Sequence, residues 1–278
     1  MDRDLALEAL GALCNASVTS VQKQGSSDVS FGGVFRRGAG QQQQLLDIQH
    51  FIPTILEGEE TCSVSNTSFR SLRSVLQSGE PPADSSQLHY SRVPTGRDLV
   101  IDENEFFDPP FDYDFSGLSD TETYYRGGEV YERPSGWYRF GLKVLNKYDD
   151  NRWLGSQYRT TQSTPGEWPV SYHGTSKQGA EGIIAGYYQP GPGQAYGRGI
   201  YSTPYISEAI YYAKIFTSQK TGKSYHVILQ NRINAEYRQK HNNDKYWLIP
   251  IQAHISGEEE REEVQQAIRP YGLLLKEV

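Results

Sequence analysis

Sulfur is scarce in this 278-residue chain, which contains Cys14, Cys62 and a single methionine. Two cysteines cannot form a disulfide scaffold, and they cannot complete a zinc site of four cysteines. Long apolar runs are also missing, because no stretch approaches the roughly 20 residues that a helix needs to cross a bilayer. We therefore expect no disulfide framework, no metal site and no membrane partner.

Positive charge is in short supply as well. Acidic residues stand at Asp2 and Asp4, where a secretion signal would carry cations, so we expect an intracellular protein, cytoplasmic or nuclear. The whole chain contains 27 Lys and Arg and 34 Asp and Glu, which gives a net charge of -7. This balance disfavours binding to a phosphate backbone through bulk charge. A protein is therefore expected ahead of a nucleic acid as a macromolecular partner.

Apolar residues are too few in the first part of the chain to predict a continuous core there. Ser, Gly and Gln dominate much of it, and such composition buries little apolar surface to offset chain entropy. We expect residues 1–126 to be a low-complexity, poorly ordered region. The apolar spacing predicts short helices at 5–13 and 69–76.

The segment 98–122 has no Lys or Arg, and its many acids alternate with aromatic residues. Two interpretations are open. The segment is a solvated linker with a few anchoring aromatics, which we prefer, or it docks like a peptide on a partner or on the domain that follows.

From about residue 127 the sequence becomes rich in Tyr and Trp, and apolar runs alternate with turn signals. We predict an α+β domain over 127–278. The expected helices are 178–185 and one that Ser207 caps and that runs to about 216. The expected strands are 225–233, 246–249 and 273–276. The acidic run 257–263 is expected to begin a solvated helix in an insertion before the last strand.

Three motifs in this domain carry candidate chemistry. The first, His173-Gly174-Thr175, follows an expected strand, where a glycine allows a ligand to approach the backbone. The second, 196–204, reads Tyr-Gly-Arg-Gly-Ile-Tyr-Ser-Thr-Pro and lacks the spacing of a dinucleotide or P-loop phosphate motif. The third, 207–213, places Ala209 and Tyr212 on one helix face, so that Tyr212 can approach Tyr201 and leave a slot for a flat ring.

In this order the motifs resemble the catalytic domain of the poly(ADP-ribose) polymerase-like ADP-ribosyltransferases. The resemblance covers about 168–278 and includes the loop 190–196 and the final strand of the domain. It implies a fold of split antiparallel sheets with short helices, preceded here by a largely disordered N-terminal region. It also implies binding of NAD⁺ as a co-substrate, without a metal.

The resemblance assigns a role to each matching residue. His173 would hydrogen-bond the adenosine ribose, and Gly174 would hold the nicotinamide carboxamide through its backbone. Tyr201 and Tyr212 would stack on the two faces of the nicotinamide ring. The loop 190–196 would cover the dinucleotide. The remaining positions expected to contact NAD⁺ are Thr175, Tyr196, Arg198, Gly199 and Ala209.

Two positions depart from the family pattern. Ala209 stands where the family commonly has a serine whose hydroxyl forms a hydrogen bond with the carboxamide. The third catalytic position, a glutamate in the chain-building enzymes, falls on Tyr246, or on Lys245 if the register slips by one residue. The resemblance then implies transfer of a single ADP-ribose unit, with His173, Tyr201 and Tyr246 as the catalytic set.

Alternative classes fit the sequence less well. A toxin-like ADP-ribosyltransferase would use a Glu-x-Glu turn leading into a strand, whereas the acids at 258–260 follow the strand at 246–249. An RNA 2′-phosphotransferase would need basic residues beyond Arg198. The expected activity is NAD⁺-dependent transfer of one ADP-ribose to a macromolecular acceptor with release of nicotinamide. The alternative is a catalytically inactive binding module of the same fold.

Overall fold

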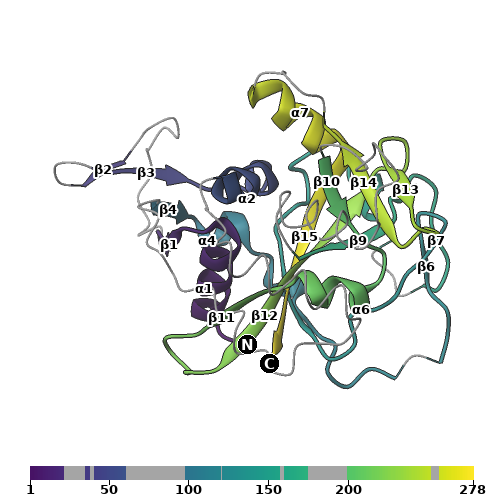
Figure 1. Ribbon diagram of the computed structural model, residues 1–278, viewed down its shortest axis with the longest axis horizontal. Helices are drawn as coiled ribbons and strands as arrows, with labels where there is room; N and C mark the ends of the chain where they lie inside the picture. Colours follow the sequence, from purple (N-terminus) through teal and green to yellow (C-terminus); the bar gives the residue numbers. More distant parts are fainter. Residues whose placement is uncertain are drawn as a thin grey trace, which may run out of the picture.

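The computed structural model describes residues 1–21, 35–37, 41–60, 98–119, 121–156, 160–174, 199–251 and 257–278. They form a mixed α/β structure with mostly antiparallel sheets and few helices (Figure 1). The α-helices are α1 (Arg3–Cys14), α2 (Phe51–Glu60), α4 (Glu103–Phe106), α6 (Ile206–Ala209) and α7 (Gly257–Ala267). The 3-10 helices are η2 (Pro109–Phe111), η3 (Arg152–Leu154) and η4 (Ile210–Tyr212).

The central sheet has the strand order β11-β12-β15-β8-β5, and β9 also pairs with β12. All of these pairings are antiparallel. Its strands are β11 (Lys214–Thr217), β12 (Ser224–Ile233), β15 (Ile268–Glu277), β8 (Tyr138–Gly141), β5 (Tyr113–Asp114) and β9 (Val170–His173). The long strands β12 and β15 are almost entirely buried, because both faces of the sheet are covered.

A second antiparallel sheet has the order β10-β14-β13 and consists of β10 (Gly199–Ser202), β14 (Tyr246–Pro250) and β13 (Gln239–His241). The two sheets meet where β9 runs beside β10. Tyr172 and Thr203 exchange backbone hydrogen bonds there, with N···O distances of 2.8 and 3.0 Å. The ends of β9 and β10 therefore lie side by side, which brings His173 and Gly174 next to the segment that contains Tyr201.

The remaining described strands lie outside these two sheets. A mixed sheet has the order β1-β4-β3-β2, from β1 (Ser17–Ser20), β4 (Asp98–Ile101), β3 (Gln41–Leu45) and β2 (Phe35–Arg37). Its β1–β4 and β3–β4 pairings are parallel. A small hairpin joins β6 (Tyr125–Arg126) to β7 (Glu129–Val130).

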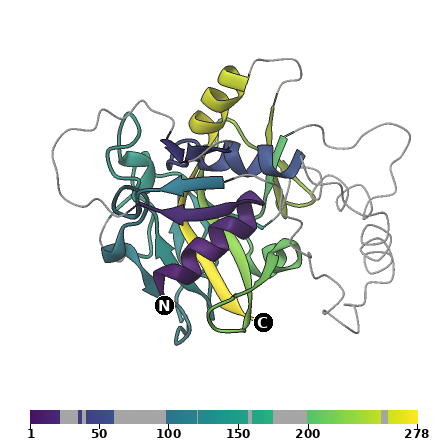
Figure 2. The same ribbon diagram turned by 90° about the vertical axis from the view of Figure 1, so that its left-hand side faces the viewer.

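Helix α1 confirms the helix expected at 5–13 and lies against β11 and β12 (Figure 2). Asp2 caps its N-terminus by accepting from the backbone N–H of Asp4. Lys214 of β11 donates to the carbonyls of Ala12 and Leu13 at 3.3 and 3.1 Å, so a cation meets the negative end of the helix.

The core continues across the boundary expected between residues 126 and 127. Leu10 of α1 and Phe51 of α2 belong to the same buried cluster as Phe140, Leu229 and Leu275 of the central sheet. Within the region 1–126, the described segments 1–21, 41–60 and 98–119 contain helices and strands whose buried side chains join this core. The apolar residues are few there, but many of them, such as Leu10, Phe51 and Phe106, are buried in the core shared with the downstream sheet.

The acidic-aromatic segment also packs on the downstream domain. Phe106, Phe107 and Phe115 are buried, and the Asp112 carboxylate accepts from the backbone N–H of Gly141 at 2.8 Å. Arg3 pairs with the same carboxylate at 3.1 Å. Of the two interpretations, docking on the following domain is therefore the one observed.

The described strands β12, β14 and β15 and the helix α7 agree with the elements expected from the sequence. The helix from Ser207 to about 216 is wrong in extent. Tyr205, not Ser207, occupies the N-cap position of α6 and makes no side-chain capping hydrogen bond; α6 then gives way to η4, and residues 214–217 form strand β11. Pairing of Lys214–Thr217 with Ser224–Val227 outweighs local helix propensity. The helices expected at 69–76 and 178–185 lie outside the described residues.

Candidate functional site

His173 ends strand β9 and is only 3 % exposed. Its Nδ1 lies 2.7 Å from the carbonyl oxygen of Tyr201, so the proton must be on Nδ1, because a carbonyl can only accept. Burial lowers the pKa of His173, which favours the neutral ring. Nε2 is then an acceptor, and it is buried without a hydrogen-bond partner among the described residues.

Gly174 follows directly and lies against the backbone that leaves α6. A Cβ atom at this position would come within 2.8 Å of the carbonyl carbon of Tyr212, 2.9 Å of the oxygen of Ala209 and 2.9 Å of the nitrogen of Ala213. These are backbone atoms that cannot turn away. A glycine is therefore required for α6 to lie this close to the end of β9.

A small cluster of tyrosines forms on one face of the second sheet. Tyr201 on β10 pairs in register with Leu248 on β14, and Tyr246 lies two residues earlier on the same strand. Because side chains alternate along a strand, these three share a face. Tyr212 packs against them from η4. We call Tyr201, Tyr212, Tyr246 and Leu248 the tyrosine cluster.

Two hydroxyl groups meet within the tyrosine cluster. The hydroxyl oxygens of Tyr212 and Tyr246 lie 3.0 Å apart, and their rings are 6.4 Å apart in an edge-to-face arrangement. Tyr201 and Tyr246 are 5 % and 8 % exposed, so the cluster is largely closed. The expected partners Tyr201 and Tyr212 are thus brought together, and Tyr246 joins them.

The two departures from the family pattern are visible here. Ala209 is buried on the side of α6 that faces β9, where its methyl group offers no hydrogen bond. Tyr246 begins strand β14, whereas Lys245 belongs to the preceding turn and pairs with Glu208 of α6 at 2.8 Å. In this register it is Tyr246 that reaches the tyrosine cluster.

Gly199 is the other expected glycine that the structure describes. A Cβ there would collide with the backbone oxygen of Ile249, so only glycine permits β10 and β14 to pair this closely. Thr175, Tyr196, Arg198 and the loop 190–196 lie outside the described residues.

The ion pair of Glu208 with Lys245 was not anticipated as part of the site. The sequence did indicate that Glu208 lies near Tyr212, because the two are four residues apart and such residues share a face of the expected helix. Its partner could not be inferred from spacing, since Lys245 is brought near by the turn between β13 and β14.

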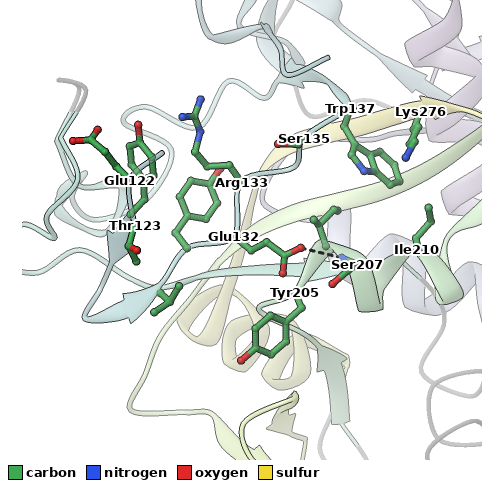
Figure 3. Close-up of a pocket in the computed structure, with 14 residues that line it drawn as sticks. Glu122, Thr123, Glu132, Arg133, Ser135, Trp137, Tyr205, Ser207, Ile210 and Lys276 are labelled. Atoms are coloured by element: carbon green, nitrogen blue, oxygen red, sulfur yellow. Dashed lines mark hydrogen bonds between the residues drawn. The ribbon is translucent and has the colours of Figure 1, made fainter. Parts of the chain in front are cut away.

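A cavity of about 590 Å³ lies beside another part of α6 (Figure 3). Trp137, Ile206 and Ile210 supply apolar wall, and Glu132 points at Ser207, accepting from its backbone N–H at 3.3 Å. Burial raises the pKa of the Glu132 carboxyl. No member of the tyrosine cluster lines this cavity, so it is separate from the candidate site.

In the part of the chain that the structure describes, no group of three or more His, Cys, Asp and Glu side chains is arranged to hold a metal ion. Over the same residues, no helix has the length and apolar character needed to span a membrane.

Comparison with known proteins adds no assignment. No protein-family model matches the chain, and a search of curated proteins finds no match.

Proposed function

We propose that the chain transfers a single ADP-ribose unit from NAD⁺ to a macromolecular acceptor and releases nicotinamide. The observation that carries the proposal is the meeting of His173, Gly174 and the tyrosine cluster at the junction of two sheets. These residues come from separate segments of the chain, and the family pattern named them as one site.

The chemistry of the residues fits NAD⁺. The neutral His173 presents a buried acceptor nitrogen, which suits the hydroxyl of a ribose. Tyr201 and Tyr212 offer aromatic surface to a cationic nicotinamide ring. Breaking the bond from nicotinamide to ribose develops positive charge on the ribose, as in glycoside cleavage, and orientation and electrostatics lower that barrier.

Binding of a nicotinamide analogue such as benzamide tests the site. The analogue should raise the melting temperature of the protein through mass action. Tyr201→Ala should lose roughly 0.5–1.5 kcal/mol of analogue binding energy from stacking. A folded Tyr201→Ala variant with unchanged affinity would refute the nicotinamide slot.

Incubation with labelled NAD⁺ tests the reaction. Label and released nicotinamide should appear together, and mass spectrometry should find one ADP-ribose unit on each modified position. No carboxylate stands at Tyr246 or Lys245 to activate a ribose that is already attached. Additions beyond one unit would contradict this assignment.

A binding module of the same fold is the second candidate, and the closure of the tyrosine cluster favours it. The hydroxyls of Tyr212 and Tyr246 already form a hydrogen bond with each other, and the side chain of Tyr201 is only 5 % exposed, so little of the tyrosine cluster is open to a ligand. Analogue binding without any nicotinamide release from NAD⁺ would select the module over the enzyme.

A further inference from the structure

Two polar contacts tie α6 and η4 to the start of β14. In one, the hydroxyls of Tyr212 and Tyr246 lie 3.0 Å apart. In the other, Nζ of Lys245 lies 2.8 Å from Oε1 of Glu208. Glu208 and Tyr212 are four residues apart, and Lys245 and Tyr246 are consecutive. The ion pair of Glu208 with Lys245 therefore joins the same two chain segments that the hydroxyls of Tyr212 and Tyr246 join.

Two other acids, Asp244 and Glu132, lie near α6 or the start of β14, but their carboxylates make other contacts. Asp244 pairs with Lys240 at 3.0 Å, and its side chain is 56 % exposed. Glu132 approaches α6 at the backbone of Ser207, where it lines the separate cavity (Figure 3). Glu208 is 22 % exposed, and its carboxylate pairs with Lys245, the residue before Tyr246.

Resting on the proposed function, we propose that Glu208 is the base of the single transfer and accepts the proton of the acceptor when the acceptor attacks NAD⁺. Lys245 is the positioning residue that holds it. One carboxylate has two oxygens and about four lone pairs, so a contact with Lys245 leaves capacity for a second hydrogen bond. The base would thus come from α6 in place of the strand.

The step balances without a further reactant. The bond between ribose C1′ and the nicotinamide nitrogen breaks, and its electron pair neutralises the ring as nicotinamide leaves. A lone pair of the acceptor forms the new bond to C1′. The acceptor's proton passes to the Glu208 carboxylate and from there to solvent.

Two small acceptors separate this role from a structural one. Water must lose a proton when it attacks, whereas azide is already an anion and has none to lose. In Glu208→Gln, nicotinamide release with water should fall about 100-fold or more. Base catalysis typically contributes a factor of about 100 or more, and azide has no proton to lose, so formation of ADP-ribosyl azide and the affinity for benzamide should stay within about threefold. Glu236→Gln removes an exposed acid elsewhere and should change neither reaction.

Glu208→Asp keeps the charge but withdraws it by one methylene, so it should also lose the water reaction and retain the azide reaction. Equal rates with water in the wild-type chain and both variants would overturn the role of Glu208 while leaving the proposed function intact. Equal losses with water and azide would overturn it too. A wild-type chain that binds benzamide but releases no nicotinamide with either acceptor would refute the proposed transfer, and the role of Glu208 with it.

Discussion

The contacts of α1 and of α6 attach two helices to the sheets in opposite chemical ways. Helix α1 buries an apolar face that includes Leu5, Leu10 and Leu13, and its polar contacts, such as Lys214 at its C-terminal end and Gln219 at Glu8, add to that burial. Helix α6 has four residues and approaches β9 over a glycine. An ion pair joins it to Lys245 in the turn before β14, and the Tyr212 hydroxyl of the following η4 meets that of Tyr246 on β14. The first contact supplies stability through buried area, and the second assembles polar groups at the candidate site.

The largest expected effect breaks the α1 contact. Leu10→Ala removes a fully buried side chain and should cost about 2–5 kcal/mol of unfolding free energy, from lost burial and the cavity left behind. Denaturant unfolding measures the cost. Leu7→Ala, at a partly buried position of the same helix, should cost clearly less. Equal and small losses would show that α1 does not belong to the core.

The next effect breaks the approach of α6 to β9. Gly174→Ala should destabilise the chain by about 1–3 kcal/mol, because the new methyl group forces backbone apart. Benzamide affinity should fall with it, since Tyr212 moves with η4. Gly117→Ala is the matched control, because a Cβ there meets nothing within 4 Å. A stable Gly174→Ala variant with full affinity would contradict the close approach.

These two contacts also differ in how far the sequence predicts them. The apolar spacing of residues 5–13 predicted helix α1, but the same scarcity of apolar residues led us to place it outside the core. Docking was not visible because the residues that receive it, such as Leu229 and Leu275, are about 220 residues or more further along the chain. Local spacing carries no information about such pairings.

For the candidate site, the order of motifs predicted that His173, Gly174, Tyr201 and Tyr212 would converge, and the described residues do. The end of α6 was wrong because pairing of β11 with β12 is a tertiary effect that local propensity cannot register. The ion pair of Glu208 with Lys245 also depends on tertiary structure, so local sequence patterns did not predict it.

A pH titration separates His173 from the rest of the core. Burial lowers the native pKa of His173, so the unfolded chain binds its proton first as the pH falls below about 6.5. Stability should be complete above that pH and fall below it, by at most about 1.4 kcal/mol per pH unit for one group. His226 and His241 also have lowered pKa values and contribute with the same sign. The difference between wild type and His173→Asn isolates His173, and parallel pH curves would refute its neutral, buried state.

The smallest expected effect sharpens the comparison at the polar side of α6. Tyr246→Phe removes one hydroxyl and keeps the ring. The hydroxyl oxygens are 3.0 Å apart, which is longer than the usual 2.7–2.8 Å of an O–H···O bond, so the loss should lie in the lower half of about 0.5–1.5 kcal/mol. Denaturant unfolding measures it against Tyr211→Phe, whose side chain is 71 % exposed and whose substitution should leave stability unchanged. A loss as large as that of Leu10→Ala would show that the hydroxyl pair is a main support of the fold. A small loss means that η4 is held to β14 weakly enough for a ligand hydroxyl or ring to replace the contact, which is what a binding site at the tyrosine cluster requires.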